Sequence, residues 1–463
     1  MPHNVPLRQC RAIGRDIQLG DWERYDHHAK RVREIDGPTY LYCIRSAAST
    51  SAKYFTLATL FALKGVPLLP KVDRLRYDDS LGHGIYRPTL FLRCFGTTSL
   101  RSLALVLTAE RNGEVEQLLV ALPDYIRYLQ TFELTISHRN FGSYLRSFSA
   151  VLAQCEGLES SKLAIHSIRE PPNFTLLATL ASWHNLRQLS ITTFADIQAP
   201  PCGAPVSREE LTFPNLRVIS SDLWNMGATK YLFKLCVYPA LETLAIVAES
   251  GIVHTLIPRL DTQVSRDTLQ SLSILGHNNG PAARVYTDNR IILSETLRPL
   301  QNFRNLQYLN IRIDYYYAIK IDDGAWETFA GAWPHLRSLW VTGDGYVETT
   351  ADYIAATYKA IAHLARLCTK LETIDIVIRD GGIPDDVVRT IEALPTSSCL
   401  AYLCLQHSPI VDLHFAASWI AKMLPRVSEV WRTLTPGGPV LEWTALSALV
   451  NSEHSRRTTV LSR

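Results

Sequence analysis

At 463 residues the chain is longer than one hydrophobic core usually supports. Hydrophobic residues make up 47% and charged residues 20%, a balance that excludes large-scale disorder. Lys plus Arg (47) nearly balances Asp plus Glu (44), and no basic cluster stands out along the sequence, so its charge does not indicate a nucleic-acid partner. Neither a signal-peptide core nor an apolar run of about 18 residues occurs. We therefore expect a cytoplasmic or nuclear protein that binds neither nucleic acid nor membranes.

Residues 1–65 do not fit the pattern that follows and predict an N-terminal helical cap or linker. A first helix is expected over 21–35, with Asp21 as its N-cap. A second apolar helix is expected near 52–63. The first helix has one apolar stripe, formed by Trp22, Tyr25, Ala29 and Val32.

One apolar pattern, L-x-x-L-x-I or a close variant, recurs along residues 66–445, about 30 residues apart. We call its three apolar positions the first, second and third anchors. Clear copies begin at Leu100, Leu186, Leu241, Leu269, Leu306, Leu336, Leu371 and Leu400. Weaker copies begin at Val72, Ile126, Leu158, Leu216 and Val427.

The segments between these copies have helical spacing, for example 115–126, 141–155, 352–368 and 412–424. One strand and one helix cannot bury their apolar faces alone, but stacked units share a continuous core. The sequence thus predicts the α/β class and an irregular leucine-rich-repeat solenoid with a curved parallel sheet and outer helices. Residues 446–463 are expected to form a loose C-terminal tail.

The predicted repeats depart from the regular leucine-rich pattern at one position. The buried asparagine expected eight residues after the first anchor is replaced, so the backbone groups of the turns must be satisfied differently in each repeat. Its replacements are Thr108, Phe194, Trp224, Glu249, His277, Asp314, Asp344, Arg379 and Ser408.

Two short motifs, Asp21-Trp22-Glu23-Arg24-Tyr25 and Ala29-Lys30-Arg31-Val32-Arg33, and the segment 414–431 carry a family resemblance. Over about residues 9–445 the sequence resembles fungal F-box proteins with leucine-rich repeats. The resemblance implies substrate recognition for a cullin-type ubiquitin ligase, with the F-box binding a Skp-type adaptor. The F-box itself is not found, because only 21 residues precede Trp22. Either the chain is truncated, or it keeps the recognition surface without the ligase connection.

The strand positions between the anchors are expected to face solvent on the concave side, where they would contact a protein target. Early repeats carry small or polar residues there, and later repeats carry larger ones. Exposed Trp, Tyr and Arg are frequent binding hot spots. For two of these residues an alternative to partner binding stays open. Trp340 could instead tuck under a loop of an adjacent repeat, and Arg312 could instead pair with Asp314 or Asp375. The predicted partner-binding residues are Tyr308, Asn310, Arg312, Trp340 and Tyr402.

Motifs of metal sites and enzymes are missing from the sequence. No two of the nine cysteines have CxxC spacing, so we expect free thiols, with Cys236 and Cys368 acting as small apolar residues. His27 and His28 point about 100° apart on a helix and are expected at the surface. The acid pairs at 322–323 and 385–386 stand where carboxylates favour a following helix N-terminus. We predict no cofactor, no metal and no catalytic residues.

Together these patterns predict a non-catalytic protein-interaction scaffold that resembles the substrate-recognition part of an F-box subunit. The alternative is a leucine-rich-repeat regulator or scaffold that is independent of ubiquitin. Neither the identity of the target nor the oligomeric state follows from the residues.

Overall fold

A computed structural model describes residues 19–36, 68–78, 88–107, 112–137, 145–155, 157–166, 174–193, 210–223, 232–277, 291–313, 318–343, 354–379, 399–405, 408, 412–427, 429–431 and 440–461. They belong to two compact units, unit 1 (residues 1–216) and unit 2 (residues 217–463). Several expectations lie outside the described residues: the helix near 52–63, Asp314, and the acid pair at 385–386.

Among its described residues, unit 1 has one sheet of six parallel strands, in which each strand lies beside the next one in sequence. The order is β1 (Glu34–Asp36), β2 (Arg74–Asp78), β3 (Ser102–Leu107), β4 (Thr131–Ser137), β5 (Ser160–His166) and β6 (Gln188–Thr193). A short strand, β7 (Leu211–Thr212), follows outside this sheet.

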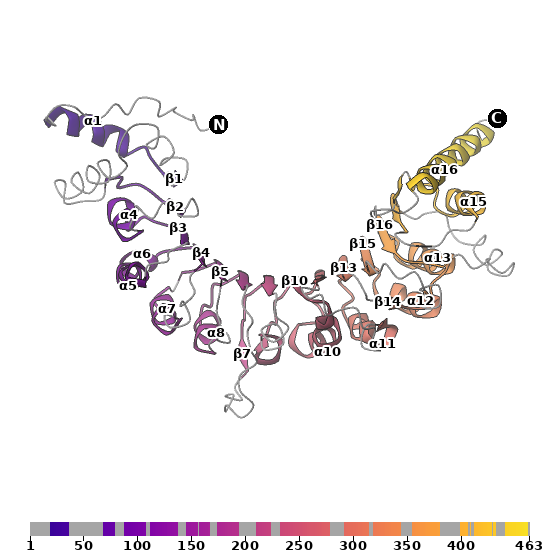
Figure 1. Cartoon of the computed structure of the whole chain (residues 1–463), viewed down its shortest axis with the longest axis horizontal. Helices are drawn as coiled ribbons and strands as arrows, with labels where there is room; N and C mark the ends of the chain where they lie inside the picture. The colour runs from indigo at the N-terminus through magenta and orange to yellow at the C-terminus, as the bar shows by residue number, and fades with distance from the viewer. Residues whose placement is uncertain are drawn as a thin grey trace. The chain divides into compact units, whose positions relative to one another are not determined.

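The helices of unit 1 cover one face of its sheet (Figure 1). They are α4 (Pro88–Phe95), α5 (Asn112–Ala121), α6 (Pro123–Ile126), α7 (Leu145–Leu152) and α8 (Phe174–Ala181), and α1 (Leu19–Ala29) precedes them. The anchors face these helices: Leu103 and Leu105 on β3 are at most 1% exposed, while the residues between them are half-buried. We call the opposite, helix-free face the strand face.

Unit 2 repeats the arrangement with eight described parallel strands in one sheet. The order is β8 (Val218–Leu223), β10 (Thr243–Glu249), β11 (Ser271–His277), β13 (Tyr308–Ile313), β15 (Ser338–Gly343), β16 (Thr373–Ile376), β17 (Tyr402–Cys404) and β18 (Glu429–Trp431). On the helix side, β12 (Ile291–Leu293) pairs in parallel with β14 (Ala318–Lys320), and β9 (Cys236–Val237) is a further short strand.

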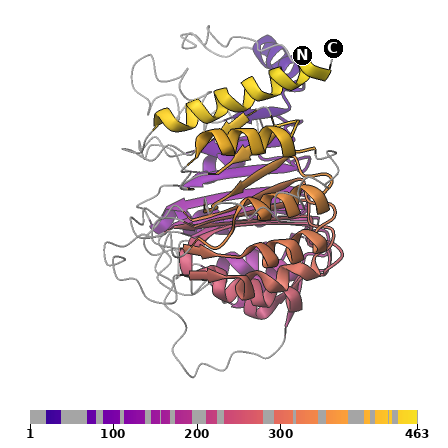
Figure 2. The same cartoon turned by 90° about the vertical axis from the view of Figure 1, so that its right-hand side faces the viewer.

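The helices of unit 2 again lie on one side of the sheet, and Figure 2 shows several of them stacked beside its strands. They are α10 (Val253–Gln263), α11 (Ser294–Leu297), α12 (Asp323–Ala332), α13 (Tyr358–Leu367), α15 (Leu413–Met423) and α16 (Val440–Leu461), with the 3-10 helices η2 (Ser250–Ile252) and η5 (Arg298–Asn302). The predicted α/β class, an irregular leucine-rich-repeat solenoid with a parallel sheet and outer helices, is confirmed in both units.

The N-terminal segment folds differently from the expected helix over 21–35. The helix α1 ends at Ala29, and Asp21 lies inside it rather than at its N-cap. Residues Glu34–Asp36 form β1, in which Ile35 pairs with Leu75. The spacing of Val32 and Ile35 suits a helix face as well as the two anchors of a repeat, and burial of Ile35 in the sheet selects the strand. The sheet therefore begins before residue 66.

One predicted repeat is misplaced by three residues. The helix α6 ends at Ile126, so the first anchor of β4 is the buried Leu129 instead. The strand pairing supports this position, because Phe132 then lies opposite Leu103 as second anchor. With this correction, three successive first anchors stand 29 residues apart: Leu100, Leu129 and Leu158.

The C-terminal residues are helical rather than the loose tail that we expected. The helix α16 runs over Val440–Leu461 and packs against α15 and β18. Leu446 and Val450, one helical turn apart, are at most 1% exposed. Burial of these two side chains stabilises a segment whose later residues are polar. The predicted domain boundaries at 65 and 445 stay a prediction.

Side chains in the turns bind the backbone of a neighbouring repeat. The Trp333 indole Nε1 donates to the Leu300 carbonyl (2.9 Å), and Trp183 makes the equivalent bond to the repeat before it (3.2 Å). Ser408 stands where regular repeats have asparagine, and its Oγ accepts from the Ile378 N–H (2.9 Å). Two repeats thus use an equivalent tryptophan, and a third uses a serine at the position of the replaced asparagine.

Two neighbouring carboxylates cap two different helices. Asp322 is the N-cap of α12, as predicted, and accepts from the Ala325 N–H (2.8 Å). Asp323 instead reaches the N-terminus of α13, where it accepts from the Thr357 N–H (2.8 Å), the Thr357 hydroxyl (2.7 Å) and the Ala360 N–H (3.2 Å). This carboxylate therefore joins two successive helices.

His363 on α13 makes the stability of unit 2 dependent on pH. Its side chain is 11% exposed, and Nδ1 lies 3.3 Å from Glu327 Oε1. Burial lowers the pKa of His363 from its ordinary 6.5, and Glu327 opposes this shift. The imidazole of His363 therefore binds a proton more tightly in the unfolded chain than in the folded one. As a result, the contribution of His363 to stability is present above pH 6.5 and is lost as the pH falls towards the lowered pKa. The other charged groups that act on it are Arg366, Lys359 and Asp323.

We therefore expect the free energy of unfolding to fall when the chain is acidified from pH 7.5 through 6.5, and to fall less in His363→Gln. Urea unfolding of both proteins at several pH values measures the difference between the two slopes. Identical pH dependence in the wild type and the variant would contradict the expectation.

The buried cysteines are free thiols, as predicted for Cys236 and Cys368. Burial raises the pKa of each of these two thiols to about 12, so they stay protonated at neutral pH. Among the described residues, no helix is both long enough and apolar enough to cross a membrane.

Candidate functional site

The five predicted partner-binding residues all lie on the strand face of unit 2. They belong to β13, β15 and β17, which are three of four consecutive strands in the sheet. Parallel pairing places their side chains in rows across the strands, about 4.8 Å apart. One row contains Tyr308, Ser338, Thr373, Tyr402 and Glu429, and the next contains Asn310, Trp340, Asp375 and Cys404.

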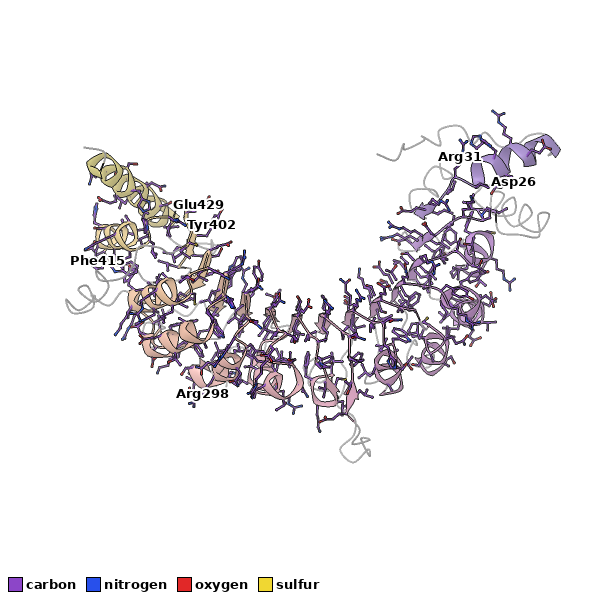
Figure 3. All side chains as sticks on the ribbon, turned by 180° about the vertical axis from the view of Figure 1, so that it is seen from behind. Asp26, Arg31, Arg298, Tyr402, Phe415 and Glu429 are labelled. Atoms are coloured by element: carbon purple, nitrogen blue, oxygen red, sulfur yellow. The ribbon has the colours of Figure 1, made fainter. Side chains whose placement is uncertain are left out.

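The two tyrosines are the most exposed members of this surface. Tyr308 and Tyr402 are 47% and 46% exposed. Figure 3 shows Tyr402 and Glu429 on the strand face, whereas Phe415 lies on the helix side of the same unit. The two tyrosines stand in the same row, with β15 and β16 between their strands.

At the centre of the surface, Arg312 stacks on Trp340. The guanidinium carbon lies 3.8 Å from the centroid of the indole ring, an arrangement that brings the cation over the electron-rich ring face. Arg312 Nη2 also lies 4.0 Å from Asp375 Oδ2. Arg312 thus crosses the intervening strand β15 to reach β16. Of the two acids that the sequence left open, Asp375 is in reach, and Asp314 lies outside the described residues.

Asp375 supplies a nearly buried charge beneath this stack. Its side chain is 5% exposed, against 42% for Arg312. A carboxylate in such a place requires a cation nearby, because water solvates it poorly. The pair therefore keeps Arg312 over Trp340, while part of the guanidinium faces solvent.

Several polar atoms of this cluster lack hydrogen-bond partners among the described residues. They are Asn310 Oδ1, Arg312 Nε and Trp340 Nε1. The amide of Asn310 is otherwise fixed, because its Nδ2 donates to Ser273 Oγ (3.2 Å). Buried polar atoms without partners cost about 1–3 kcal/mol each. The cluster therefore has hydrogen-bonding capacity that the described protein does not use.

One neighbour in this surface was missed from the sequence. Glu429 pairs with Tyr402 across β17 and β18 and is half-buried. The signal was present, because Glu429 stands between the anchors Val427 and Val430, as Tyr402 stands between those of its own repeat.

The strand face of unit 1 has a different character. Its described side chains are mostly small, polar or charged, such as Ser102 and Ala104, and none is aromatic. Glu133 and Lys162 form an ion pair there (2.6 Å). Within the described part of the chain, exposed aromatic rings on a strand face therefore occur only in unit 2. The same part of the chain has no group of three His, Cys, Asp or Glu residues placed to hold a metal ion.

Comparison with known proteins adds one structural likeness. The sequence matches no family model, and the comparison with curated proteins finds no match. Among solved structures, the chain is similar to an internalin from Listeria monocytogenes, with 13% sequence identity and a TM-score of 0.37, over 85% of this chain and 99% of that one. A score this low carries no argument, so the fold rests on the strand pairing itself.

Proposed function

We propose that the chain is a non-catalytic scaffold that binds a protein partner on the strand face of unit 2. The observation that carries the proposal is the Arg312–Trp340 stack, with the exposed rings of Tyr308 and Tyr402 on the same face. These residue types are enriched at the centres of protein interfaces. Because buried anchors and the Asp375 pair hold the side chains in place, binding costs little side-chain entropy.

Recognition on this surface would combine apolar contact with hydrogen bonding. The tyrosine rings supply contact area on either side of the stack. Acceptors of the partner would satisfy donors such as Arg312 Nε and Trp340 Nε1 after a small adjustment of these side chains, which recovers part of the cost of leaving them unpartnered. Asn310 presents an acceptor in the same row as Trp340.

The more specific proposal follows the resemblance to fungal F-box proteins with leucine-rich repeats. In that case the surface selects substrates for a cullin-type ubiquitin ligase in the cytoplasm or nucleus, and partners perform the ubiquitin chemistry. A pull-down with a purified Skp-type adaptor tests this version. If neither this chain nor one extended by its upstream coding sequence retains the adaptor, the ligase version is wrong. The second candidate, a ubiquitin-independent regulator or scaffold, then remains.

Combined substitution of Trp340→Ala and Tyr308→Ala is expected to weaken binding of the protein partner by about 30-fold or more, the size typical of interface hot spots. Affinity purification with wild type and variant identifies proteins that only the wild type retains, and calorimetry with the purified partner measures the loss of affinity.

Phe415→Ala provides the matched control, because Phe415 is an exposed aromatic residue of unit 2 on the helix side. This control is expected to bind as the wild type does. If the double variant retains the same partners with unchanged affinity, the strand face of unit 2 is not the binding surface.

A further inference from the structure

Seven exposed cations gather where the chain enters the first strands of unit 1. We call this surface the basic edge; it consists of Lys30, Arg31, Arg33, Lys71, Arg74, Arg101 and Arg127. They stand in the turns that precede β1, β2, β3 and β4, or at the first residue of β2. Figure 3 places Arg31 at the β1 end of this unit.

The parallel repeats bring these turns side by side. The Arg74 N–H donates to the Arg33 carbonyl (3.1 Å), the Arg101 N–H to the Asp73 carbonyl (2.8 Å), and the Gln130 N–H to the Arg101 carbonyl (2.8 Å). These bonds continue the strand spacing of about 4.8 Å into the turns. Cations far apart in sequence are therefore brought into neighbouring turns: Arg33 and Arg101 share one row, with Asp73 between them, and Arg74 stands in the next row.

Two of the arginines are held in place by backbone carbonyls of the following turn. Arg33 Nη1 donates to the Lys71 carbonyl (3.2 Å), and Arg101 Nη1 donates to the Tyr128 carbonyl (3.3 Å). Each guanidinium has five N–H donors, so both keep further donors for a ligand. Fixing them in advance reduces the entropy that binding costs.

The charge of the basic edge is not neutralised by the described residues. None of the seven cations forms an ion pair with a described residue. The acids in these turns, or at the first residues of the strands that follow them, are Asp73 and Glu34. Equivalent turns of unit 2 are paired instead, as in Arg217 with Glu242 (3.1 Å) and Arg337 with Glu372 (3.5 Å). Unit 1 thus keeps a local positive field in its turns, whereas two of the equivalent arginines of unit 2 are neutralised.

We propose that the basic edge binds an acidic segment of a polypeptide partner. Five of its seven cations are arginines, whose planar fork suits carboxylates. The basic edge crosses four strands, about 14 Å at the usual strand spacing, which an extended run of about four or five Asp or Glu residues would span. This surface lies outside the aromatic cluster of unit 2 and does not depend on it.

A polypeptide fits the surroundings of the basic edge better than a nucleic acid does. Grooves for single-stranded nucleic acids interleave cations with several stacking aromatics. The turns here expose one aromatic ring, Tyr128, and the guanidinium of Arg127 lies 6.0 Å from its centroid.

The test titrates a fluorescent deca-glutamate peptide into the full-length chain and follows its anisotropy. Lys71→Glu with Arg74→Glu is expected to weaken binding at least about tenfold, because two attractive charges become repulsive. Both side chains are exposed and form no hydrogen bond or ion pair with described residues that the reversal would break, and thermal unfolding checks that the variant folds. Arg298→Glu with Arg304→Glu is the matched control, with the same change in net charge at two exposed sites of unit 2.

The proposal is supported if the control binds as the wild type does and only the edge variant loses affinity. Equal losses in both variants would mean that net charge alone attracts the peptide, and would overturn it. A deca-thymidylate or an anionic phosphatidylserine vesicle that binds the basic edge more tightly than the peptide would overturn it in favour of that ligand. Trp340→Ala should leave the peptide affinity unchanged, so failure here and failure of the proposed function are distinguishable.

Discussion

Gly96→Ala is expected to destabilise unit 1 by about 3 kcal/mol, near the upper range for inserting one methyl group into a packed site. Gly96 follows α4, and a Cβ atom there would collide with the Leu92 carbonyl oxygen and the Tyr125 ring. The oxygen cannot retreat easily, since the Gly96 N–H itself donates to it (2.6 Å). The collision therefore forces α4 away from the segment that carries Tyr125.

Urea unfolding, followed by hydrogen exchange to locate the loss in unit 1, measures this effect. Gly331→Ala is the matched control, because its Cβ would meet nothing within 4 Å. Gly331 lies inside α12, where alanine is favoured over glycine by up to about 1 kcal/mol. The control is expected to stabilise slightly. A similar loss in both variants would contradict the explanation by close packing.

Asp323→Ala is expected to destabilise unit 2 by about 2–3 kcal/mol, since it removes a charged acceptor of three hydrogen bonds between α12 and α13. The Thr357 N–H and hydroxyl then lose their acceptor, whereas the Ala360 N–H keeps its bond to the Thr357 carbonyl (3.0 Å). Asp323 is half-buried, so water replaces its carboxylate only in part. Thermal or urea unfolding of the full chain measures the loss.

Asp322→Ala separates this effect from ordinary capping. It removes one exposed bond to the Ala325 N–H and is expected to cost about 1 kcal/mol. Asp323→Asn, which keeps one acceptor oxygen, should fall between the two. An Asp323→Ala protein no less stable than Asp322→Ala would show that the link between the helices contributes nothing.

The repeat architecture was predictable because its signal is local and periodic. A short strand with buried alternate residues, repeated at near-constant spacing, permits stacking into a parallel sheet. The predictions of the first helix and of the first anchor of β4 were wrong because, in each case, one sequence pattern fits two structures. Val32 and Ile35 suit a helix or a strand, and Ile126 and Leu129 are both apolar residues next to a turn. In each case a tertiary contact, not the local sequence, decides.

The candidate site was predictable in its position but not in its internal contacts. Alternation along each strand places Tyr308, Trp340 and Tyr402 on the strand face whatever surrounds them. The choice of Asp375 by Arg312 depends on the reach of a side chain across a neighbouring strand, which sequence spacing does not contain. The basic edge was missed for a similar reason, since its cations come from four separate turns.

The bridge from Arg312 over Trp340 to Asp375 limits how this array can change its length. Duplicating or deleting one repeat is a simple way for a solenoid to grow or shrink, since each repeat contacts mainly its neighbours. Between β13 and β16, however, an inserted repeat would move the arginine and its carboxylate one strand farther apart, and a deleted one would remove the indole between them. Gains and losses of whole repeats are therefore tolerated better elsewhere in unit 2 than across these three strands.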